Sequence, residues 1–124
     1  MNQADVELVI THPEGYELAE EFTAGAEVTT NQQEALQDAD FVYVKNWSSY
    51  REYGQVLTDG EGWMLSAEKL QATNKAKVMH CLPVRRNVEL SDELLDGPDS
   101  LVLEQANNRT YAAQAVLKRM LEAL

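Results

Sequence analysis

The stretch AKVMHCLPVRRN, residues 76–87, joins a short apolar run to a proline turn and two adjacent arginines. The apolar run at residues 76–79 predicts a buried β-strand, because it is short, continuous and bounded by polar residues. His80 and Cys81, the only cysteine of the chain, follow it directly. A buried strand that delivers a thiol, a rigid turn and two guanidinium groups to its carboxyl end predicts a functional site at this point of the fold.

Length, charge and cysteine content limit the class of protein. A chain of 124 residues predicts one domain, and 21 acidic against 10 basic residues give a net charge of −11. This charge argues against binding to nucleic acid or to an anionic membrane, because phosphate groups need a basic surface. A single cysteine cannot form an internal disulfide, and no apolar run approaches the roughly 20 residues of a membrane span. We therefore expect a cytoplasmic protein.

Short strands alternate with short helices along the chain. Strands are expected at residues 6–10, 26–29, 41–44, 77–80 and 100–103, and helices at 16–22, 32–37, 66–70, 91–95 and after Asn107 or Asn108. This alternation predicts an α/β fold with three layers, in which helices cover both faces of a mainly parallel sheet. Residues 51–65 carry three glycines and predict a mobile functional loop.

The predicted strand ends carry reactive or charged side chains. Ligands bind outside the carboxyl ends of the strands in open parallel sheets, so residues that follow the strands are candidates for a site. These residues are His12, Pro13 and Glu14 after the first strand; Lys45, Asn46 and Trp47; Cys81, Leu82, Arg85 and Arg86; and Glu104, Asn107, Asn108 and Arg109 after the last.

Several interpretations of these residues stay open. Cys81 is either a small buried hydrophobic residue or a thiolate favoured by nearby cations. A catalytic pair of His80 and Cys81 is disfavoured, because adjacent strand residues point to opposite faces. Arg85 and Arg86 form either a solvated surface or a clamp for a carboxylate or phosphate. The spacing of histidine and cysteine does not suggest a metal site, and no glycine-rich motif indicates a nucleotide.

Three motifs, in order, resemble the aspartate/ornithine carbamoyltransferase family. They are DFVYVKNW at residues 40–47, HCLPVRRN at 80–87 and EQANNR at 104–109. The Lys-x-Trp and His-Cys-Leu-Pro-x-Arg-Arg-Asn patterns are similar to those of the N-acetylornithine and N-succinylornithine carbamoyltransferases. The resemblance runs along nearly the whole chain, but it covers only the carboxyl-terminal, amino-acid-binding half of such enzymes.

This resemblance implies a reaction and a set of residue roles. Carbamoyl phosphate and an N-acylated ornithine would give N-acylcitrulline and phosphate, in arginine biosynthesis, without a metal or other cofactor. Cys81 and Leu82 would contact carbamoyl phosphate, with the Leu82 carbonyl near the attacking amine and a cis peptide bond after Leu82. Arg85 would polarise or order this region, Arg109 would contact carbamoyl phosphate, and Lys45 would bind the acylated amino acid.

Lys45 bears on the choice of substrate. The plain ornithine enzymes place an aspartate at this point, which suits a free α-ammonium group. A lysine would repel that group and would instead donate to a carboxylate or an acyl carbonyl. Glu89 stands where some acetylornithine enzymes carry a modifiable lysine, so no such modification is expected. The choice between an acetyl and a succinyl substrate stays open.

The family's phosphate-binding Ser-x-Arg-Thr-Arg loop does not occur in the 124 residues. We therefore expect residues 1–124 to form a single, truncated, ornithine-binding domain without the carbamoyl-phosphate domain, inactive alone because charge on the departing phosphate lacks its main clamp. The resemblance implies a trimer only together with the other domain. A non-catalytic ligand-binding or interaction module is the alternative, and a nucleotide-binding regulatory domain has only the fold class in its favour.

Overall fold

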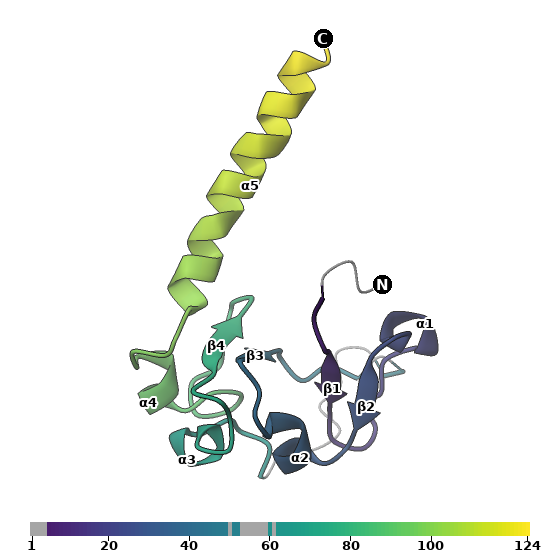
Figure 1. Ribbon diagram of the computed structural model, residues 1–124, viewed down its shortest axis with the longest axis vertical. Helices are drawn as coiled ribbons and strands as arrows, with labels where there is room; N and C mark the ends of the chain where they lie inside the picture. The colour runs from purple at the N-terminus through teal and green to yellow at the C-terminus, as the bar shows by residue number, and fades with distance from the viewer. Residues whose placement is uncertain (1–4, 50, 53–59, 61) are drawn as a thin grey trace.

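The computed structural model describes residues 5–49, 51–52, 60 and 62–124, and it confirms an α/β fold with parallel strands (Figure 1). The prediction of a mobile loop at residues 51–65 falls largely outside this described part. The elements, in order, are β1 (Val9–Thr11), α1 (Glu20–Thr23), β2 (Glu27–Thr29), α2 (Gln32–Leu36), β3 (Phe41–Val44), α3 (Ala67–Leu70), β4 (Lys77–His80), α4 (Asp92–Leu95) and α5 (Val102–Glu122).

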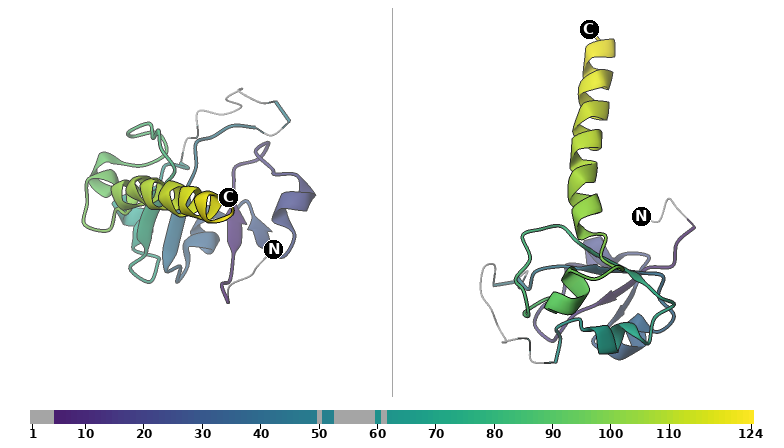
Figure 2. Two further views of the ribbon diagram at one scale, coloured as in Figure 1. Left: turned by 90° about the horizontal axis from the view of Figure 1, so that it is seen from above. Right: turned by 90° about the vertical axis from the view of Figure 1, so that its left-hand side faces the viewer.

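The strands form two parallel pairs, β1 with β2 and β3 with β4. In the second pair Val42 lies opposite Val78, and Val44 lies opposite His80. Figure 2 shows the strands side by side beneath α5. Because parallel strands end at the same edge, this register places the residues after Val44 next to those after His80.

Three short helices begin with a capping side chain. The side chains of Asn31, Ser66 and Ser91 accept hydrogen bonds from the backbone N–H groups of Glu34, Lys69 and Leu94, respectively. Each bond satisfies one of the backbone donors that the first turn of a helix leaves unpaired. Gly25 follows α1 with a φ of 86°, which glycine adopts without steric cost.

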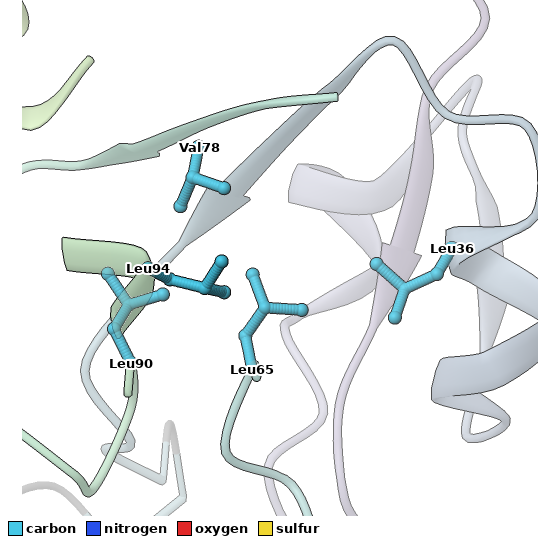
Figure 3. Close-up of a cluster of buried hydrophobic side chains, with 5 residues drawn as sticks. All are labelled: Leu36, Leu65, Val78, Leu90 and Leu94. Carbon is cyan, nitrogen blue, oxygen red and sulfur yellow. The ribbon is translucent and has the colours of Figure 1, made fainter. Parts of the chain in front are cut away.

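The hydrophobic core lies beneath β4 and joins four segments that are distant in sequence. Its buried members are Leu36, Leu65, Val78, Leu90 and Leu94 (Figure 3). The segments that carry Leu65 and Leu90 are tied by two backbone bonds, from Leu65 N to Glu89 O at 2.9 Å and from Ser91 N to Leu65 O at 3.0 Å. The core therefore fixes the segment after the proline turn as firmly as it fixes the strand before it.

The predicted strand at residues 100–103 is wrong. Ser100 makes only an isolated bridge to Val78, through bonds from Val78 N to Asp99 O and from Leu101 N to Val78 O, both 2.8 Å long. The chain then enters α5 at Val102, so the predicted cap at Asn107 or Asn108 is wrong too. The run of apolar residues here serves a helix entry, since Val102 is buried while Leu103 is 77% exposed.

Helix α5 projects away from the body of the protein (Figures 1 and 2). Its first turns contact β4. The large apolar residues of its second half are exposed: Val116, Leu117, Met120, Leu121 and Leu124. Among the described helices, none combines the length and apolar character needed to cross a membrane.

The core predicts a steep difference between two leucine substitutions. Leu90→Ala removes a side chain with no solvent exposure and should lower the free energy of unfolding by about 2–5 kcal/mol, because it leaves a cavity. The matched control Leu103→Ala should change it by less than about 0.5 kcal/mol. Urea unfolding followed by circular dichroism measures both, and equal effects would contradict the assignment of the core.

Candidate functional site

The turn after β4 has an unusual backbone. The Leu82–Pro83 peptide bond is cis, as the family resemblance implies, and Leu82 has a φ of 54°. A positive φ is uncommon for a residue other than glycine, and such conformations gather at functional sites. The Leu82 N–H donates to Nδ1 of His80 at 3.0 Å, so the turn folds back onto the strand that precedes it.

His80 is completely buried at the end of β4. Because its Nδ1 accepts from Leu82, the neutral ring carries its proton on Nε2. Nε2 is buried and finds no hydrogen-bond partner within the described part of the chain. Burial lowers the pKa of His80, Glu89 acts to raise it, and Lys45 acts to lower it further. Lys45 and Glu89 therefore both lie close enough to affect this ring.

Cys81 is half-buried and free, next to the buried His80. Their different burial agrees with the expectation that the two side chains point apart. Since Nδ1 of the histidine is already used by the backbone of Leu82, the geometry gives the pair no base in contact with the thiol. The turn thus carries a free, half-buried thiol next to the main-chain carbonyl of Leu82.

Arg85 is held by Glu89. The carboxylate accepts from the Arg85 backbone N–H at 2.9 Å and from Nε at 2.6 Å, and it forms an ion pair with one terminal nitrogen, Nη2, at 2.5 Å. The Glu89 side chain has no exposed surface, whereas 46% of the Arg85 side chain is exposed. The arginine therefore reaches from a buried carboxylate to the surface.

Arg86, in contrast, is fully engaged by α4. Its terminal nitrogens donate to Asp92 at 2.7 Å and to both carboxylate oxygens of Asp96 at 2.7 and 2.8 Å. These bonds to Asp96 and then Asp92 raise the pKa of Arg86, and its guanidinium lowers the pKa of both carboxyl groups. The structure thus separates the two arginines: Arg86 pairs with Asp92 and Asp96 at α4, whereas Arg85 pairs with the buried Glu89.

The loop after β3 lies beside this turn. Lys45 is exposed at its start and, through the pairing of Val44 with His80, follows the strand next to the turn. The ring of Trp47 packs against Gly60, where a Cβ would clash with it and only glycine leaves the space free. The buried Ser49 donates to the carbonyl of Gly15 at 3.1 Å. The loops after β1 and β3 therefore meet.

The other predicted residues are less closely connected to the turn. Arg109 lies on α5 and donates through Nε to its own helix, to the Ala106 carbonyl at 3.3 Å. Nδ1 of His12 lies 2.9 Å from the Pro13 carbonyl, as expected of a turn residue. No group of three potential metal ligands occurs within the described ranges.

Two features were missed by sequence reasoning. Glu89 was expected only as a replacement for a lysine, yet its carboxylate is buried behind Arg85. Buried side-chain oxygens without a partner in the described chain also lie at the last residue of β1, in the loop after β3 and in the first turn of α5, at Thr11, Asn46 and Gln105. The spacing of Arg85 and Glu89 was visible in the sequence, but burial of a glutamate is rare and depends on distant segments.

Comparisons with known proteins agree along the whole chain. The family model described as "Aspartate/ornithine carbamoyltransferase, Asp/Orn binding domain" matches residues 1–120. The chain is 47% identical to the N-succinylornithine carbamoyltransferase of Bacteroides thetaiotaomicron, across 100% of this chain and 40% of that protein. It is 36% identical to the ornithine carbamoyltransferase of Methanosarcina mazei, across 94% and 42%. The chain thus spans about two-fifths of the length of these relatives.

Solved structures show the same fold. An acetylornithine transcarbamylase complexed with acetylcitrulline aligns with a TM-score of 0.77 and 25% identity, across 90% of this chain and 39% of that one. The ornithine carbamoyltransferase from Pyrococcus furiosus aligns with a TM-score of 0.75 and 28% identity, across 90% and 40%.

The buried His80 predicts a pH dependence of stability. Its folded pKa lies below the ordinary 6.5, so the unfolded chain binds the proton more tightly. The free energy of unfolding should therefore fall as the pH falls below about 6.5, until the folded ring also becomes protonated. Urea unfolding between about pH 7.5 and pH 5.5 measures this slope. A His80→Gln variant should lack the histidine part of the slope, and an unchanged slope would contradict the assignment.

Proposed function

The chain belongs to the aspartate/ornithine carbamoyltransferase family, and from this we propose that it is the amino-acid-binding part of a carbamoyltransferase for N-acylated ornithine. In the proposed reaction the δ-amine attacks the carbamoyl carbon of carbamoyl phosphate. A C–N bond forms, the C–O bond to phosphate breaks, and the amine loses a proton. The products are N-acylcitrulline and phosphate. We assign this reaction to arginine biosynthesis in the cytoplasm.

The observation that carries the proposal is Lys45 beside the turn at Leu82. The lysine is exposed and follows β3, while the turn follows the adjacent β4. A cation here favours a carboxylate or an acyl carbonyl and disfavours a free α-ammonium group. The similarity to a protein named N-succinylornithine carbamoyltransferase supports the same substrate class.

We assign the remaining roles around the turn. Cys81 and the carbonyl of Leu82 would contact carbamoyl phosphate, with that carbonyl facing the amine that attacks. Arg85, exposed on its outer side, would polarise or order this region, and Arg109 would approach carbamoyl phosphate from α5. A main-chain carbonyl suits the amine because it accepts a hydrogen bond without adding a charge.

We further propose that residues 1–124 act as one domain that requires a second, carbamoyl-phosphate-binding domain, and that a trimer forms only with that domain. The described residues offer Arg85 as the one arginine of the turn that is not taken up by α4. A single such cation is a weak clamp for a departing phosphate. The alternative, a binding module without chemistry, would retain the same Lys45 site, so binding alone does not separate the two.

The substrate class predicts a ligand preference. Calorimetric titration of the 124-residue protein with N-acetylornithine, N-succinylornithine and ornithine should show binding of the acylated compounds and weaker binding of ornithine. Lys45→Asp should weaken the acylated ligands by roughly tenfold, because it replaces an attracting charge with a repelling one. Lys118→Asp, at an exposed position on α5, is the matched control for net charge. Preference for plain ornithine by the unsubstituted protein would contradict the proposal.

Because a second domain is proposed to bind carbamoyl phosphate, the 124-residue protein alone should produce no N-acylcitrulline above background. The substrates are carbamoyl phosphate and either acylornithine. The measurement is a colorimetric assay for the ureido group, with a complete N-succinylornithine carbamoyltransferase as positive control. Turnover at the rate of that control would show that the chain needs no second domain.

A further inference from the structure

Glu89 is the only buried carboxylate among the residues that the structure describes. A buried charge costs free energy unless it is paired and hydrogen-bonded. The partners of the Glu89 carboxylate therefore indicate its role. All the bonds found for this carboxylate run to Arg85: to the backbone N–H, to Nε and to Nη2. One residue thus receives both oxygens of the buried group.

The backbone of Glu89 is held by two hydrogen bonds. Its N–H donates to the carbonyl of Arg85 at 3.3 Å, and its carbonyl accepts from Leu65 at 2.9 Å. Leu65 and Leu90, on either side of this contact, are core residues. The carboxylate is therefore carried by backbone that is tied to the hydrophobic core.

The ion pair with Glu89 orients the guanidinium group of Arg85. Glu89 takes the edge formed by Nε and Nη2, and the other terminal nitrogen, Nη1, has no bond to the described residues. Because 46% of the Arg85 side chain is exposed, an anion can reach this arginine from the solvent. Arg86 provides the contrast, because Asp92 and Asp96 occupy both of its terminal nitrogens. The two adjacent arginines thus differ in how much of each guanidinium group is occupied by carboxylates.

We propose that Glu89 is a positioning residue, which turns the Nε–Nη2 edge of Arg85 inward and thereby presents Nη1 to an anionic oxygen of the substrate. This proposal deepens the function proposed above and rests on it for the identity of the substrate. The anionic oxygen belongs either to the carboxylate of an N-acylornithine or to a phosphate group. Both are planar or tetrahedral acceptors that a guanidinium group binds directionally.

The first experiment measures the order of Arg85 without any ligand. In the ¹⁵N-labelled protein, the heteronuclear NOE of Arg85 Nε should be close to that of the backbone amides of β4. In Glu89→Gln, an isosteric change that removes the charge, it should fall toward the value of a mobile side chain while the β4 amides keep theirs. Asp96→Asn is the matched control, since it weakens an arginine–carboxylate pair at Arg86 instead.

The second experiment tests whether Glu89 acts through Arg85. Affinities for N-succinylornithine and for inorganic phosphate are measured in the unsubstituted protein, Glu89→Gln, Arg85→Gln and the double variant. Glu89→Gln should weaken the preferred anion by on the order of tenfold, as expected when one charge-assisted bond is misplaced. In the Arg85→Gln background the same change should have no further effect. Asp96→Asn should leave both affinities unchanged.

The outcomes separate this proposal from the proposed function. A mobile Arg85 Nε in the unsubstituted protein, or additive losses in the double variant, would overturn the positioning role. Binding of phosphate but not of N-succinylornithine would overturn the substrate and leave the role of Glu89 intact. Binding of neither would overturn the anion site. If Glu89→Gln does not fold, Arg85→Lys replaces it, because lysine keeps the charge but lacks the edge that Glu89 grips.

Discussion

The parallel pairing of β3 with β4 is the constraint on which the rest of the site depends. By placing Val44 opposite His80, it brings two segments that are more than thirty residues apart in sequence to the same edge. Lys45 and the turn at Leu82 are neighbours only because of this register. A slip of one residue would turn every side chain of a strand to the other face, so burial of Val78 in the core also determines where the lysine stands.

Charge is distributed unevenly in this protein. The chain carries a net charge of −11, yet the edge next to the turn presents Lys45 and Arg85, with one buried carboxylate between them and the core. Three acidic residues elsewhere have basic partners: Asp92 and Asp96 pair with Arg86, and Asp99 pairs with Lys77 at 2.6 Å. A local cationic site in an acidic protein favours small anions and, unlike an extended basic face, does not attract polyanions.

Local sequence determined the parts of the fold that could be predicted. Asn31, Ser66 and Ser91 cap helices because the bond is made within three residues, and β3 and β4 are short apolar runs with clear ends. The start of a helix at Val102 could not be predicted, because a short apolar run is compatible with either a strand or a helix. The isolated bridge between Ser100 and Val78, which decides between the two, is a contact between distant residues. In the site, motifs indicated Lys45 and Cys81. The burial of Glu89 depends on Leu65, which lies 24 residues earlier, and no local pattern contains it.

Helix α5 divides the molecule into parts of unequal cooperativity. Its beginning is anchored by Val102, which is 2% exposed, but its later turns have little beyond their own backbone bonds to hold them. Most of the stability of a helix in a protein comes from packing of its apolar face, and this face of α5 is exposed. The later turns therefore fray without disturbing the core, and their amide hydrogens exchange long before those of β4. Any thermal or denaturant curve that follows helicity consequently reports two events, of which only the second is the unfolding of the domain.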